Sequence, residues 1–256
     1  MKNLLRQSIF LLVLLLSFNG FSKELTPVQK RAISDFISLV NDRDWIGVSD
    51  VIAYPLPRKH PLEDISNKED FLSQQGELFD DSLINLIANS HPDSNWRAVG
   101  SRGLRFMRGE LWLDESGRLI SVNYKSEAAR VREEGMIEAD REALPVFLQE
   151  YERPVLTMDA GKWIIRIDQV KGMSYRFVGW IQGNRNPNRD AVEIIFNGFL
   201  EYQGSGGNHT YTFKNDLGTF VCYINELRSD ETPEGELVLY RDGEVYRRYP
   251  SVELER

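Results

Sequence analysis

Four side chains in the first half of the chain have the chemistry of a general acid or base: His60, His91, Asp114 and Tyr124. Proton transfer at neutral pH needs such a group in surroundings that shift its pKa. The stretches "PRKHPLED" and "NSHPDSN" place both histidines in proline-bounded loops, where surface exposure is expected. Asp114 ends a predicted hairpin strand, where aspartate is a common turn former. We keep His91 and Asp114 as candidate bases, and favour the interpretation that neither is catalytic.

Five arginines within residues 97–118 form the densest basic cluster of an acidic chain: Arg97, Arg102, Arg105, Arg108 and Arg118. A guanidinium can hold a carboxylate or phosphate through two parallel hydrogen bonds. Arg105 and Arg108 are therefore candidates for binding an anionic ligand or partner. The alternative, which we favour, is that arginines on strands pair with the plentiful acidic side chains and cover sheet edges.

The stretch "EYQGSGGNHTYTF", residues 201–213, places three glycines, Asn208 and His209 between two aromatic-rich runs. It links strand to strand and lacks lysine, whereas a phosphate-cradling loop precedes a helix, so phosphate binding of that kind is excluded. A hairpin turn needs only one or two residues with positive φ. The excess glycine predicts either a β-bulge, which we favour, or an open recognition loop presenting Asn208 and His209.

Neither a metal nor another cofactor is expected. The chain has no His-Glu-x-x-His motif and no paired cysteines, and its three histidines have no ligand spacing. Cys222 is the only cysteine, so no intrachain disulfide can form. It lies among apolar residues in "GTFVCYIN", a pattern typical of a small buried hydrophobe.

The first half is predicted to be helical and then to form a β-hairpin. A capping box at Thr26, with proline at the first helical position, opens a helix whose apolar residues recur at helical spacing. Further short helices follow, one of them opening at Ser66 with Glu69 as its capping partner. From Trp96 the pattern becomes strand-like, and residues 110–124 predict a hairpin around the turn "DESGR".

The second half, from about Pro154, has the pattern of an antiparallel β domain. Eight short strands are expected, and Asn197-Gly198 and Asp242-Gly243 predict two-residue hairpin turns. Such a meander forms either a closed barrel or a sandwich. Aromatic residues at alternating positions could stack on a sugar ring or a peptide, although we favour core packing for them. They are Trp163, Tyr175, Trp180, Tyr202, Tyr211 and Tyr223.

The first residues are typical of a secretory signal peptide. Lys2 and Arg6 precede an apolar run, and Gly20 and Ser22 are the small residues of a cleavage site after Ser22. The run is shorter than the roughly 18 residues of a membrane span, so no span is expected after cleavage. The formal charge of −8 becomes more negative by two once the leader is removed. We therefore expect a periplasmic or secreted protein that does not bind nucleic acid, whose phosphates require basic clusters.

Residues 24–125 resemble the nuclear-transport-factor-two-like fold, also called SnoaL-like or cystatin-like, an α+β cone. The stretches that carry the resemblance are "TPVQKRAISDFISLVNDRDWIGVSDVI", "ISNKEDFLSQQGELFDDSLINLI" and "NWRAVGSRGLRFMRGELWLDESGRLISVNY". The resemblance covers less than half of the chain. It implies a cone that binds small ligands, with isomerisation or dehydration in some members, and we interpret the whole chain as an exported bacterial protein.

The predicted architecture is therefore α+β with four parts: a signal peptide (1–22), a cone-like α+β domain (23–125), a charged helical linker broken at Gly135 and Pro145 (126–153), and an antiparallel β domain (154–256). The favoured function is a cell-envelope binding or interaction protein without catalysis, whose partner is a protein, a glycan or a small ligand. The alternative is a small-molecule isomerase or hydrolase that uses the pocket of the cone. A buried Asp or His in an open cone would favour the enzyme, and a cone filled by side chains would favour the binding protein.

Overall fold

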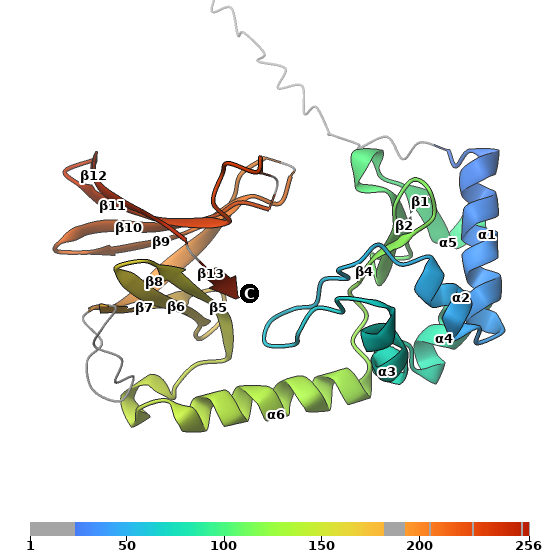
Figure 1. Ribbon diagram of the computed structural model, residues 1–256, viewed down its shortest axis with the longest axis horizontal. Coiled ribbons are helices and arrows are strands. Elements are labelled where there is room, and N and C mark those ends of the chain that lie inside the picture. The colour runs from blue at the N-terminus through green and yellow to red at the C-terminus, as the bar shows by residue number, and fades with distance from the viewer. Residues whose placement is uncertain (1–23, 182–192, 205, 227, 252, 256) are drawn as a thin grey trace, which may run out of the picture.

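A computed structural model describes residues 24–181, 193–204, 206–226, 228–251 and 253–255, so the predicted signal peptide lies outside the described residues. The chain forms two lobes, joined by the long helix α6 (Glu127–Ala143) (Figure 1). The first lobe packs helices on a small sheet, and the second is built around a large curled sheet. No helix in the described part of the chain is both long and apolar enough to cross a membrane.

Helices open the first lobe: α1 (Pro27–Asn41), α2 (Trp45–Asp50), α3 (Lys68–Leu78), α4 (Asp81–Ala88) and α5 (Pro92–Asn95). The predicted capping box of α1 is confirmed, because Thr26 accepts a hydrogen bond from the backbone N–H of Gln29 and the Gln29 side chain returns one. The predicted start of α3 is wrong by one residue. Asn67, not Ser66, is the N-cap, because its side chain accepts from the backbone N–H of Asp70.

A four-stranded antiparallel sheet follows, in the order β1-β2-β3-β4. Its strands are β1 (Trp96–Ala98), β2 (Leu104–Phe106), β3 (Leu111–Leu113) and β4 (Leu119–Val122), with the 3₁₀ helix η1 (Gly100–Arg102) between the first two. The predicted hairpin is confirmed as β3 and β4. Apolar side chains fill the space between helices and sheet, with the Trp96 ring 6.3 Å from Phe36 and 4.9 Å from Phe106. Within 24–125, Ser49 is the only buried polar residue.

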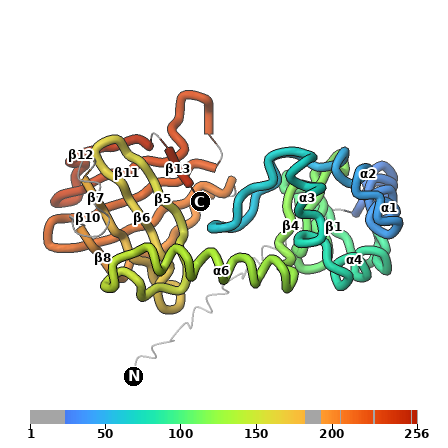
Figure 2. Tube along the Cα trace, turned by 60° about the horizontal axis from the view of Figure 1, so that its bottom comes forward, coloured from blue at the N-terminus to red at the C-terminus, as the bar shows by residue number. Residues whose placement is uncertain are grey.

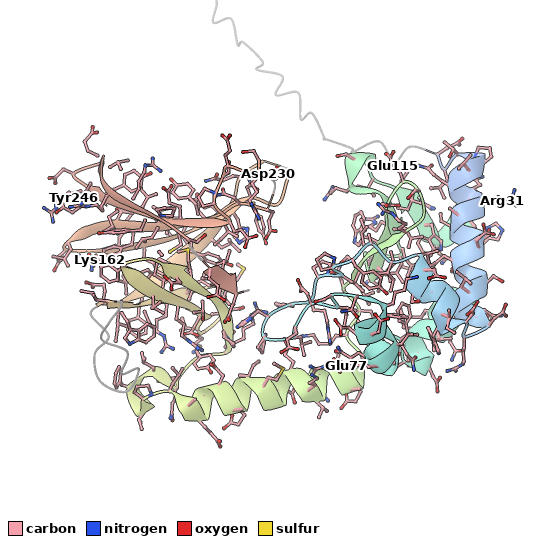
Figure 3. The ribbon with its side chains drawn as sticks, viewed as in Figure 1. Arg31, Glu77, Glu115, Lys162, Asp230 and Tyr246 are labelled. Atoms are coloured by element: carbon pink, nitrogen blue, oxygen red, sulfur yellow. The ribbon has the colours of Figure 1, made fainter. Side chains whose placement is uncertain are left out.

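Helix α6 is continuous through Gly135, so the predicted break at Gly135 is wrong, whereas the predicted break at Pro145 is confirmed because the helix ends at Ala143. One glycine costs a helix only about 1 kcal/mol relative to alanine, which its neighbours outweigh. The N-terminal end of α6 is tied to α3. Glu77 lies where α3 meets the start of α6 (Figure 3). Ser126 caps the helix and donates to the backbone carbonyl of Glu77, while Arg132 and Arg58 both pair with the Glu77 carboxylate.

The second lobe is one curled antiparallel sheet of nine strands, a half-barrel, in the order β12-β11-β10-β9-β8-β7-β6-β5-β13 (Figure 2). This is nearer to the predicted barrel than to the predicted sandwich. Consecutive in the chain, β12 and β13 pair with opposite ends of the sheet, β12 with β11 and β13 with β5. The strands are β5 (Arg153–Ala160), β6 (Trp163–Gln169), β7 (Tyr175–Ile181), β8 (Glu193–Tyr202), β9 (His209–Asn215), β10 (Gly218–Ile224), β11 (Gly235–Arg241), β12 (Glu244–Pro250) and β13 (Glu253–Glu255).

One of the two predicted Asn-Gly and Asp-Gly turns is confirmed. Asp242 and Gly243 connect β11 to β12, both with positive φ. The other prediction is wrong, because Asn197 and Gly198 lie inside β8. Asn197 has a φ of 60° and the register between β7 and β8 shifts there, so the pair forms a bulge that needs the same backbone conformation as a turn. A Cβ atom on Gly198 would lie 2.1 Å from the ring of Phe213.

Buried charges attach the C-terminal end of α6 to the outer face of the curled sheet. Asp168, fully buried on β6, accepts hydrogen bonds from Arg166 at 2.7 Å and from Arg176 at 2.6 Å. Arg166 also binds both carboxylate oxygens of Asp140 on α6, and the Tyr151 hydroxyl donates to the same carboxylate at 2.5 Å. Burial raises the pKa of Asp168, and the two guanidiniums act against it. We call these five residues the α6 joint.

Replacement of Gly198 by alanine tests the close packing of β8 on β9. We expect Gly198→Ala to lower the free energy of unfolding by about 1–3 kcal/mol, because the new methyl group overlaps the Phe213 ring. Urea denaturation measures the change. Gly135→Ala is the matched control: its Cβ meets open space on a helix, so it should raise the same free energy by up to about 1 kcal/mol. Equal effects of the two changes would contradict the packing.

Removal of the Asp168 charge tests the α6 joint. Asp168→Asn leaves two buried guanidiniums without their shared anion, and we expect a loss of about 3–5 kcal/mol in the free energy of unfolding. The control is Glu127→Gln, which breaks an exposed ion pair with Arg130 on the same helix and should change stability little. A small effect of Asp168→Asn would mean that the attachment of α6 does not depend on the buried carboxylate of Asp168.

Candidate functional site

The two candidate bases are placed where neither is suited to proton transfer. His91 is the N-cap of α5, accepts from the backbone N–H of Asp93 and lines a surface hollow of about 390 Å³ with its side chain 69% exposed. Burial raises the pKa of Asp114, but hydrogen bonds from Ser116 and Arg118 outweigh it and bring the pKa below its ordinary value. Asp114 is therefore a turn-forming carboxylate that stays ionised at neutral pH.

His60 is half-buried, although its loop suggested exposure at the surface. The loop between α2 and α3 extends from the first lobe toward the second in both views (Figures 1 and 2). Burial lowers the pKa of His60, and the positive charge of Arg166 acts in the same direction. His60 is therefore neutral at pH 7. The proline-bounded sequence around His60 could not predict that Arg166, from the other half of the chain, lies near it.

The five arginines of the predicted cluster differ in their ion pairing. Arg118 pairs with Asp114 at 2.8 Å, as the favoured alternative expects. Arg105 is half-buried, and its Nε atom is enclosed without a hydrogen-bond partner. The backbone N–H of Arg108 donates to Glu110. Within the described ranges, four of the five arginines take part in no ion pair: Arg97, Arg102, Arg105 and Arg108.

The glycine-rich stretch is the loop that joins β8 to β9. The ladder runs without a register shift as far as the pair Tyr202–His209, so the glycines lie in the loop and not in a bulge of the described ladder. Gly204 and Gly207 have positive φ, and a Cβ atom on Gly204 would meet open space. The backbone carbonyl of Asn208 accepts from the N–H of Gln203 at 2.6 Å. The predicted recognition residue His209 begins β9.

His209 belongs to a row of rings that follows the inner face of the curled sheet. Its ring centroid lies 5.7 Å from that of Tyr202 and 5.4 Å from that of Tyr211. Tyr211 in turn lies 4.9 Å from Tyr175. The register carries this row across β7 and β6 to the first residue of β5, Arg153, since Gln169 pairs with both Tyr175 and Arg153. We call Arg153, Tyr175, Tyr202, His209 and Tyr211 the Arg153 site.

The guanidinium of Arg153 is a desolvated cation without a counter-ion. Its Nε and Nη1 atoms are enclosed and have no hydrogen-bond partner, and no ion pair to Arg153 occurs among the described residues. Burial lowers the pKa of Arg153, and Tyr211 and Tyr175 act against this. Leaving such a group unpaired costs free energy that a hydrogen-bonded partner would recover.

Two tyrosines of the site, Tyr175 and Tyr211, are protonated hydrogen-bond donors. Burial raises the pKa of Tyr211 and of Tyr175, so neither phenol can serve as a base near neutral pH. A guanidinium flanked by phenol hydroxyls and ring faces can hold an anionic group and pack against its apolar part. The arrangement is therefore suited to binding an anionic group that carries an apolar part.

Part of this site could be found from the sequence. Tyr175, Tyr202 and Tyr211 were among the aromatic residues considered for stacking, and His209 among the candidates for recognition. Arg153 was missed because it stands at the boundary between the linker and the β domain, ahead of the first expected strand. The only available signal was its position directly before Pro154 and an apolar run.

No protein-family model, curated protein or solved structure matches the chain. In the described part of the chain no three His, Cys, Asp or Glu side chains are grouped so as to hold a metal ion. Cys222 is fully buried, and burial raises the pKa of its thiol, which makes it the small hydrophobe that its strand predicted.

Replacing the unpaired cation should make the protein more stable. We expect Arg153→Met to raise the free energy of unfolding by about 1–3 kcal/mol, since it removes a buried polar group that has no partner. Urea denaturation provides the measurement. Arg248→Met is the control, because it removes an arginine of the same lobe that pairs with Glu236, and it should not stabilise the protein. A loss of stability in Arg153→Met would show that the guanidinium holds the sheet together.

Proposed function

We propose that the protein is a binding protein of the cell envelope, without catalytic activity, which holds an anionic ligand at the Arg153 site. The enclosed Nε and Nη1 atoms of Arg153 support this most directly. A carboxylate or phosphate of the ligand would supply the acceptors that the chain does not, with Tyr175 and Tyr211 as further donors. The rings of Tyr202 and His209 would contact the apolar part of the ligand.

The cellular setting is inferred from the sequence alone. The basic start, apolar run and small residues of 1–22 support export to the periplasm or beyond. An acidic exported chain agrees with a protein, a glycan or a small ligand as the partner, and not with nucleic acid. The relationship of residues 24–125 to the nuclear-transport-factor-two-like fold stays a prediction.

Catalysis in the first lobe is the less favoured alternative. An isomerase or hydrolase would need an open interior with a buried acid or base. Apolar side chains occupy that interior, among them Phe36, Trp96 and Phe106. His91 is exposed and Asp114 is held in a turn. These observations support binding over turnover.

Calorimetric titration with paired ligands tests the proposal. The panel contains short peptides with free or amidated C-termini, uronic acids beside neutral sugars, and sugar phosphates beside the sugars. We expect at least one anionic member to bind and its neutral partner to fail. Arg153→Gln should weaken that binding at least about tenfold, since a hydrogen bond to a charged group contributes about 1.5–3 kcal/mol.

Two further variants separate the site from general charge effects. Arg247→Gln removes an exposed positive charge from β12 of the same lobe and should leave the affinity nearly unchanged. His209→Ala removes ring contacts at the edge of the site and should weaken binding without unfolding the protein. Equal binding of neutral and anionic ligands would contradict the proposal, and so would turnover of any panel member.

A further inference from the structure

A second group of unpaired cations lies on the small sheet of the first lobe. Strand residues alternate between the two faces, so Trp96, Leu104 and Phe106 point into the core while the residues between them point away. Arg97 on β1 is the direct partner of Arg105 on β2, and Arg105 is the partner of Trp112 on β3. We define the arginine face as Arg97, Arg102, Arg105 and Trp112.

The closeness of these like charges lowers the stability of the folded protein. Like charges directly opposite one another on neighbouring strands are destabilising, and Arg97 and Arg105 form such a pair. The nearby acids form their ion pairs and hydrogen bonds with other groups, although the charge of Asp93 also acts on Arg97. Asp93 pairs with Lys30 at 2.5 Å, Asp114 pairs with Arg118, and Glu110 accepts from a backbone N–H. Two like charges that face each other across neighbouring strands without an ion pair to offset their repulsion are typical of a functional surface.

The guanidiniums of the arginine face are held in place by the protein, and some of their N–H groups have no acceptor in the described chain. Nη1 of Arg97 donates to the backbone carbonyls of Asp93 and Trp96, at 2.9 and 2.7 Å, which orients the group and leaves its other N–H groups free of protein partners in the described chain. Nε of Arg105 is enclosed without any partner. The guanidinium of Arg102 lies 6.0 Å from the ring centroid of Trp112.

We infer that the arginine face binds an acidic polysaccharide. Its unpaired guanidiniums match carboxylate or sulfate groups, and the partly exposed ring of Trp112 offers an apolar platform for a sugar ring. The charges lie on the surface of a sheet and not in a pocket, which fits an extended chain better than a small ion. This site is on a different lobe from the Arg153 site and does not depend on it.

Charge density favours a polysaccharide over nucleic acid. Double-stranded DNA carries one negative charge per roughly 1.7 Å of its axis. A protein with 39 acidic and 31 basic residues repels such a polymer over most of its surface. A polyuronate carries one carboxylate per sugar, which is a lower charge density than that of duplex DNA, so a small basic face can hold it against weaker repulsion.

Titration calorimetry of the intact protein with defined oligomers tests this inference. The probes are a heparin-derived octasaccharide, an oligogalacturonate, a neutral dextran oligomer and a single-stranded oligonucleotide. We expect at least one acidic saccharide to bind at low salt, with affinity falling as salt increases, and the dextran not to bind. Arg97→Gln and Arg105→Gln should each weaken binding about tenfold, the loss of one charge-assisted hydrogen bond.

Arg118→Gln is the matched control. It removes the same charge from the same sheet, but from an arginine that Asp114 already pairs, so we expect less than a twofold change. Trp112→Phe should weaken saccharide binding while the melting temperature confirms a folded lobe. Arg153→Gln should have no effect, which separates this site from the other.

Three outcomes would overturn the inference. If Arg118→Gln and Arg105→Gln weakened saccharide binding equally, the binding would depend on the net charge of the protein and not on the arginine face. Tighter binding of the oligonucleotide than of either acidic saccharide at the same salt would assign the face to nucleic acid. Absence of binding by both acidic saccharides at low salt would mean that the unpaired arginines serve no such ligand.

Discussion

The fully buried carboxylate of Asp168 is the interaction on which the arrangement of the two lobes depends. It lies between guanidiniums of two neighbouring strands, and Arg166 carries the attraction on to Asp140 of α6. Each charge in the α6 joint is tolerable only because the others are present, so the group behaves as one unit. The ring of Tyr151 lies within 5.1–5.6 Å of three guanidiniums, which makes the joint compact as well as neutralised.

Because α6 is held at both ends, its length sets the spacing of the lobes. Glu77 holds the first two turns of the helix through Ser126 and Arg132, and the α6 joint holds its last turn. Its 17 residues correspond to about 25 Å. The two lobes that carry the proposed ligand surfaces are therefore joined by a helix that is held at both ends, and not by a flexible linker.

Features encoded over a few residues could be predicted from the sequence, and features made by distant residues could not. The cap at Thr26, the β3–β4 hairpin and the strand-rich second half follow from local spacing. The prediction of a hairpin turn at Asn197-Gly198 was wrong because a bulge and a turn require the same positive φ. Arg153 was beyond reach, since what distinguishes it is the lack of an acceptor around its guanidinium, which depends on five strands folding together. His60 was misjudged for the same reason, because its neighbour Arg166 lies far along the chain.

The pairing of β13 with β5 has a consequence for the solution behaviour of the curled sheet. A strand edge with open N–H and C=O groups is a template for pairing with another molecule, and β13 covers that edge of β5. The opposite edge is β12, whose exposed residues include Glu244, Arg247 and Arg248, and which ends at Pro250. Charge and proline both discourage strand addition. The sheet thus ends on one side in β13, a strand of only three residues, and on the other side in a charged strand that ends at proline, and both features make its edges resistant to aggregation.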